Sequence, residues 1–285
     1  MSYFPRQISG RVAMMAVAAA APLLFPPAAL QAQDSGNSAQ SAEAADLAKQ
    51  IQNPLATVVT VPFQYNLNQG VGEFDRTITN LNFQPVIPFP GETWNLISRS
   101  ILPFVSIPSG ETEAETGLAD LTTTLFVSPA QPGKLIWGVG PALVLPTASN
   151  PEVMGSGKLS LGPAAVLFTS AGSFTFGAVA WNVWSILGDS DRESVSQLTT
   201  QYFVNFNFGE GWALGTAPII TCDWKAPSGD QCTVPWGLQL SKVLKFGSRP
   251  VNLLAGYYYN SEHPEGGADE QIRIQVNLLY PQAPN

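Results

Sequence analysis

The segment Gln271-Ile-Arg-Ile-Gln-Val-Asn-Leu-Leu-Tyr280 decides the fold. In an extended strand, one face of this segment would be apolar and carry Ile272, Ile274, Val276, Leu278 and Tyr280. The other face would be polar and carry Arg273, Gln275 and Asn277. Alternation of this kind over about ten residues is typical of transmembrane β-barrel strands, which place one face against lipid and the other toward the lumen.

The same period of two recurs along the chain. In the second such segment, Leu81 and Phe83 alternate with Asn82, and the polar faces hold mainly Asn, Gln, Thr and Gly. A secreted β-sandwich, the alternative soluble fold, would usually expose Lys, Glu and Asp on that face. We therefore predict an all-β chain, an antiparallel transmembrane β-barrel of about 12 strands, near residues 57–67, 76–88, 94–107, 117–128, 134–147, 157–169, 173–187, 195–208, 212–224, 232–245, 250–260 and 271–280.

The connections between these segments alternate in length, as in outer-membrane barrels with short periplasmic turns and longer outer loops. The predicted outer loops contain most of the acidic residues, so we expect an anionic outer rim; they span 68–75, 108–116, 148–156, 188–194, 223–231 and 261–270. Several prolines fall inside predicted strands and oppose this interpretation unless they mark bulges, because proline cannot donate a ladder hydrogen bond. They are Pro85, Pro103, Pro141, Pro163, Pro218 and Pro235.

The N-terminus has the layout of a secretory signal peptide over residues 1–32. Arg6 and Arg11 precede an apolar run over residues 12–25, and small residues lead to Ala32, the expected cleavage site. Residues 33–53 are small and polar, and we expect a flexible or short-helical periplasmic leader there. The barrel is then expected over 54–285, exported to the outer membrane of a Gram-negative bacterium.

The composition excludes several classes of protein. Only 12% of the 285 residues are charged, about half the usual share, and the net charge is −8. Nucleic acid is an unsuitable partner for a chain without a basic stripe. One His and two Cys leave little for a metal site, and we expect no cofactor.

Several longer motifs carry a family resemblance, namely Asn53–Tyr65, Thr77–Pro88, Trp94–Pro103, Ile136–Pro141, Gly155–Lys158 and Trp181–Ser185. Through them the chain resembles bacterial outer-membrane proteins usually labelled "transporter" or "neuromedin U", which are related to the phenol meta-pathway barrel proteins. The resemblance covers roughly residues 50–281. It implies an outer-membrane β-barrel with a transport role, and it carries over no ligand residues. The tail Pro281–Asn285 departs from it, because such barrels usually end on the terminal aromatic residue.

Charged and amide side chains on the predicted inner face are candidates for a constriction. A hairpin centred near Ser109 and Gly110 would place Arg99 opposite Asp120, and such a pair could select solutes by its field or rigidify a filled lumen. The other candidates for the lumen are Lys158, Arg273, Gln201, Asn205 and Asn82. With Arg273 and Lys158 inside, we expect small neutral or anionic solutes to be preferred.

Two further features lie in predicted outer loops. Cys222 and Cys232 flank residues 223–231, and in an exported chain this arrangement predicts a disulfide. His263 follows Ser261, but no nucleophile elbow accompanies them, so a lipid-modifying enzyme is a weak alternative.

The function expected from the sequence is a narrow, non-enzymatic channel for passive passage of small molecules. The alternatives are a non-conducting structural or adhesion barrel and a lipid-modifying barrel enzyme. Expected partners are outer-membrane lipid, lipopolysaccharide, the barrel-assembly machinery and a solute that the sequence does not identify.

Overall fold

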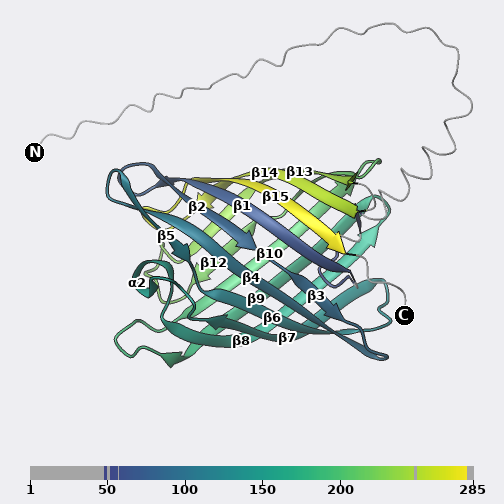
Figure 1. Cartoon of the computed structure of the whole chain (residues 1–285), viewed down its shortest axis with the longest axis horizontal. Coiled ribbons are helices and arrows are strands. Elements are labelled where there is room, and N and C mark those ends of the chain that lie inside the picture. Colours follow the sequence, from purple (N-terminus) through teal and green to yellow (C-terminus); the bar gives the residue numbers. More distant parts are fainter. Residues whose placement is uncertain (1–47, 50–51, 57, 247–248, 281–285) are drawn as a thin grey trace, which may run out of the picture.

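The computed structural model describes residues 48–49, 52–56, 58–246 and 249–280, and it forms a barrel of tilted strands (Figure 1). The predicted signal peptide, most of the leader and the tail 281–285 lie outside the described residues. The strands are β1 (Val59–Val71), β2 (Arg76–Phe83), β3 (Val86–Phe89), β4 (Trp94–Ser109), β5 (Glu113–Leu118), β6 (Leu121–Pro129), β7 (Leu135–Leu145), β8 (Lys158–Ala171), β9 (Phe174–Gly188), β10 (Ser196–Asn207), β11 (Trp212–Thr216), β12 (Ile219–Asp223), β13 (Cys232–Phe246), β14 (Arg249–Glu262) and β15 (Glu270–Tyr280). The short helix α2 (Pro151–Met154) lies between β7 and β8.

These segments close into a 12-strand antiparallel barrel, which confirms the predicted fold. Three barrel strands are each interrupted once, so that β2 and β3, β5 and β6, and β11 and β12 are successive parts of one strand. Neighbours in sequence pair along the whole barrel, and β1 pairs with β15 to join the two ends of the chain. Val59 lies opposite Tyr280 in that pair, so the barrel begins and ends at the same rim, here called the terminal end.

The connections at the terminal end are short, and those at the opposite rim, the loop end, are of two kinds. Long connections span 146–157, 189–195, 224–231 and 263–269. Two others are tight hairpins over 72–75 and 110–112, shorter than the loops predicted there, because β1, β4 and β5 continue beyond their predicted limits. None of the helical segments in the described part of the chain is long and apolar enough to cross a membrane.

The outer face of the barrel is apolar, and it carries exposed aromatic residues near both ends, with a continuous row of rings near the terminal end. Phe174, Phe206, Phe208 and Trp212 form a chain of ring contacts with centroids 5.0 to 6.3 Å apart. Amphipathic rings are favoured at the depth of lipid headgroups. This row of rings therefore fits the interfacial girdle of a membrane barrel.

Three of the six prolines inside predicted strands lie where a strand is interrupted or its register shifts, whereas Pro103 pairs in register with Asn82. Pro85 and Pro218 lie within the interruptions of the second and ninth barrel strands, and Pro235 lies at a register shift between β13 and β14. Pro141 and Pro163 lie opposite each other in the β7–β8 pair. At an interruption or a register shift, proline removes no ladder donor that the strand needs.

Candidate functional site

The barrel interior has a polar wall formed mainly by β1, β2 and β10–β15. Amide side chains form hydrogen-bonded rows along it: Gln64 donates to Asn66 over 3.2 Å, and Asn80 donates to Asn82 over 3.0 Å. Asn82 lies opposite the buried Gln64 and between the exposed Leu81 and Phe83, so it faces the lumen as expected. Uncharged amides satisfy one another in such rows without introducing charge.

The wall formed by β4 and β6–β9 is apolar, which the sequence analysis did not anticipate. Its buried cluster includes Ile97, Phe126 and Trp181. Leu55, from the segment before β1, is 5% exposed and belongs to the same cluster. Gln52 of that segment bonds Asn207 over 2.9 Å and also contacts Thr175. The end of the predicted leader therefore lies inside the barrel and narrows it.

An inner cavity of about 180 Å³ lies in the polar part of the lumen. Gln201, Asn205, Arg99 and Arg273 line it, so four of the predicted lumen residues surround one space. Asn205 contacts Thr175 over 3.5 Å, and Gln201 donates to the carbonyl of Ala217 over 3.3 Å. The sequence indicated that Gln201 and Asn205 face the lumen, because they alternate with apolar residues along their strand.

Arg99 does not lie opposite Asp120, so the predicted pairing is wrong. The hairpin turns at 110–112 and pairs Ser109 with Glu113, and the register places Thr124 opposite Arg99. Arg99 instead donates from Nη2 to Oε1 of Gln84 over 3.4 Å, and its guanidinium lies 5.7 Å from the ring centre of Trp181. A shift of a few residues in the turn was enough to change the partner.

Arg273 is 2% exposed and is held by groups from three strands. Its Nη1 donates to the carbonyl of Ala217 over 2.8 Å, its Nη2 donates to Gln271 over 2.9 Å, and its guanidinium lies 4.6 Å from the ring centre of Tyr258. The Tyr258 hydroxyl donates to Gln239 and accepts from the Ala217 amide. Ala217 and Tyr258 were not expected at this site from the sequence, although Pro218 within an alternating segment marked the interruption.

Asp120 anchors an outer loop rather than an ion pair. Its carboxylate accepts hydrogen bonds from the amide of Ala148 over 3.2 Å and from the amide and hydroxyl of Ser156 over 2.7 and 2.9 Å. Arg192 donates to the carbonyls of Gly155 and Ser156 from the other side. The loop over 146–157 is thereby attached to the rim of a vestibule of about 750 Å³ at the loop end.

Lys158 is 9% exposed, and its ammonium contacts the carbonyl of Asp189 at the loop end. It therefore binds a neighbouring loop, and it is not among the residues that line the inner cavity. The predicted lumen residues thus divide into three groups: four line the inner cavity, Asp120 and Lys158 lie at the loop end, and Asn82 belongs to the amide row on β2.

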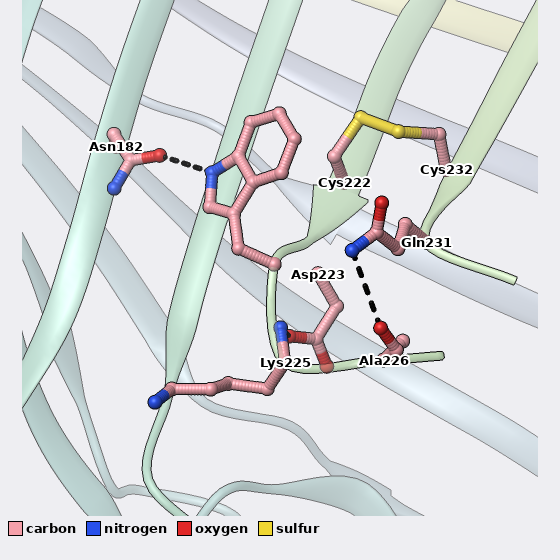
Figure 2. The surroundings of a disulfide bond; sticks show 8 residues. Asn182, Cys222, Asp223, Lys225, Ala226, Gln231 and Cys232 are labelled. Atoms are coloured by element: carbon pink, nitrogen blue, oxygen red, sulfur yellow. Dashed lines mark hydrogen bonds between the residues drawn. A yellow bond between two sulfur atoms is a disulfide. The ribbon is translucent and has the colours of Figure 1, made fainter. Parts of the chain in front are cut away.

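The predicted disulfide is present between Cys222 and Cys232, which lie opposite each other at the ends of β12 and β13 (Figure 2). Figure 2 also shows Gln231 donating to the carbonyl of Ala226 within the loop that the disulfide closes. Trp224 of the same loop donates to Asn182 of β9 over 2.8 Å. The bridge therefore holds a loop that reaches over β10 to contact β9.

The loop that carries His263 has no arrangement that resembles a hydrolase triad. The Ser261 hydroxyl donates to the carbonyl of Val234, whereas the His263 ring contacts Asp269 over 3.2 Å and the carbonyl of Pro264. In the described ranges, no group of three His, Cys, Asp or Glu side chains could hold a metal ion.

Solved structures with a similar fold are outer-membrane proteins. The COG4313 outer membrane channel from Pseudomonas putida F1 has a TM-score of 0.57 at 14% identity, over 78% of this chain and 94% of that chain. The outer membrane phospholipase from Salmonella typhi, a dimer with bound calcium, has a TM-score of 0.46 at 12% identity, over 82% and 98% of the two chains. The likeness concerns the fold alone. Protein-family models and curated proteins give no match.

Proposed function

We propose that this protein is a narrow, non-enzymatic channel through which small molecules cross the outer membrane passively. We also propose that it belongs to the transporter or "neuromedin U" family that its sequence resembles. The similarity in fold to an outer membrane channel supports this proposal. Twelve strands are intermediate between filled eight-stranded barrels and porins with 16–18 strands, which favours a narrow path.

The observation that carries the proposal is a pair of polar spaces inside one closed barrel. The vestibule opens at the loop end, and the inner cavity lies in the polar part of the lumen. Val183 of the apolar cluster lines the vestibule, and Val86, which packs against the cluster, lines the inner cavity, so the cluster adjoins both spaces. A solute that crosses would pass this cluster and Leu55, which supports slow passage of small molecules.

The proposal also covers the partners that the sequence analysis expected. The aromatic row at the terminal end and the acidic outer loops suit a barrel with that end in the periplasm and with lipopolysaccharide around the loop end. Insertion would then require the barrel-assembly machinery.

Conductance of the purified protein in planar bilayers tests the channel. We expect small, discrete current steps, below those of a 16-stranded porin, and swelling of liposomes in small neutral solutes. Heat-dependent migration on gels would confirm that the sample is folded. Absence of both current and swelling in such a sample would instead favour a structural or adhesion barrel.

Lipid hydrolysis tests the enzyme alternative directly. We expect the purified protein to hydrolyse no more lipid than protein-free micelles do. Hydrolysis by the wild type that disappears in His263→Ala would contradict the non-enzymatic proposal.

A further inference from the structure

The inner cavity is cationic. Arg99 and Arg273 both line it, and the described residues around it include no Asp or Glu. Arg273 is 2% exposed, and both guanidiniums are held by uncharged groups, namely the Gln84 and Gln271 side chains and the Ala217 carbonyl. Two positive charges thus line one space in the lumen, and its described lining has no carboxylate to balance them.

Each guanidinium also has an unused donor. Nη1 of Arg99 and Nε of Arg273 are buried and have no hydrogen-bond partner among the described residues. Burying a charged donor without a partner is costly, and a nearby negative charge offsets part of this cost. The incomplete pairing of both cations, in a cavity whose described lining has no carboxylate, therefore favours a ligand with negative charge and acceptor oxygens.

Two of the three acceptors that hold the guanidiniums come from strand interruptions. Gln84 precedes Pro85 between β2 and β3, and Ala217 precedes Pro218 between β11 and β12. The interruption lets the Ala217 carbonyl leave the ladder and accept from Arg273. Two separate strand interruptions thus supply acceptors that orient two arginines at the same cavity, as expected of a binding site.

We propose that the inner cavity is a binding site for a small organic carboxylate, held between Arg99 and Arg273. Planar guanidiniums match the geometry of a carboxylate. The amides of Asn252 and Asn277, a cross-strand pair that also lines the cavity, can donate to or accept from the rest of the ligand. This inference rests on the proposed channel function, since it assigns the class of solute that the channel selects.

Calorimetric titration of the purified, folded protein with sodium acetate at constant ionic strength tests the site. We expect saturable binding in the wild type and at least tenfold weaker binding in Arg99→Gln and Arg273→Gln. Lys134→Gln, which removes an exposed cation at the terminal end, is the matched control and should bind as the wild type does.

A second variant keeps the test valid if removing a buried arginine prevents folding. Gln84→Glu has nearly the same shape and supplies a permanent carboxylate beside Arg99. We expect it to fold, to raise the melting temperature, and to bind acetate at least tenfold more weakly because the counter-ion is already present. Wild-type affinity in folded Gln84→Glu, or no saturable binding by the wild type, would overturn the inference.

The two proposals fail separately. Acetate binding without conductance would contradict the channel and leave the carboxylate site standing. Conductance with cation selectivity, or conductance without acetate binding, would contradict the carboxylate site and leave the channel standing.

Discussion

At the scale of single residues, the polar groups of the lumen derive their roles from their neighbours. Arg99 and Asp120 have opposite charges and lie on adjacent barrel strands, yet the register separates them. Arg99 remains at the cavity with Gln84, whereas Asp120 bonds the loop over 146–157. The charges of Arg99 and Asp120 identified them as candidate site residues, but they did not predict which groups the two side chains would contact.

Replacing Asp120 by Ala should loosen the loop over 146–157. The amides of Ala148 and Ser156 lose their acceptor, and hydrogen bonds to charged groups contribute about 1.5–3 kcal/mol each. We expect their hydrogen exchange to accelerate at least about tenfold, as measured by mass spectrometry of the folded protein. Glu193→Ala, an exposed acidic residue of the next loop, is the control. Equal exchange in both variants would show that Asp120 does not hold the loop.

At the scale of elements, strand interruptions and loops shape the interior more than regular strands do. The breaks in three barrel strands each direct an acceptor inward: the Gln84 side chain, the Asp120 carboxylate and the Ala217 carbonyl. The segment before β1 adds Leu55 to the apolar wall. Departures from the regular period of two thus formed the site.

Reducing the disulfide should destabilise the barrel without preventing its closure. A bridge across a sequence separation of 10 restricts the unfolded chain, and the free energy of unfolding should fall by about 2–3 kcal/mol in Cys222→Ser/Cys232→Ser. Urea unfolding in micelles measures the loss. Reducing agent should lower wild-type stability similarly and leave the double variant unchanged; if it destabilises both equally, the effect has another source.

Truncating Leu55 to Ala should widen the path. Leu55 packs against the apolar wall, so the smaller side chain weakens the attachment of this segment inside the barrel. We expect larger or longer current steps in planar bilayers than the wild type gives. Leu96→Ala, on the lipid face of β4, removes the same atoms elsewhere and should conduct as the wild type does. Unchanged current in Leu55→Ala would mean that this segment does not limit passage.

At the scale of the whole molecule, the closed sheet separates two environments. Side chains alternate between the apolar outer face and the lumen along every strand, and closure leaves no free sheet edge. The low charge content follows from this division, because neither lipid nor the amide-lined wall accommodates many charges.

A charge placed on the outer face should therefore lower the free energy of unfolding by an amount that depends on its depth in the membrane. Val139 lies near the middle of β7 and is 50% exposed, whereas Leu135 begins that strand and is 51% exposed. We expect Val139→Arg to lower the free energy of unfolding by about 2–4 kcal/mol and Leu135→Arg to lower it by about 0–1 kcal/mol. Urea unfolding in lipid vesicles gives both values. Equal losses would indicate that this face does not contact the hydrocarbon region.

The sequence by itself determined the barrel, the phase of the clearly alternating strands and the disulfide. Alternation with a period of two reflects local backbone geometry, and the two cysteines lie at the ends of one hairpin loop. The strands and the disulfide could therefore be predicted without tertiary information. The register of Arg99, the inward position of Leu55 and the grouping of Arg99 with Arg273 were decided by the tertiary structure. They depend on where turns begin, where strands break, and which distant strands meet across the lumen, and a periodic pattern does not encode these distances.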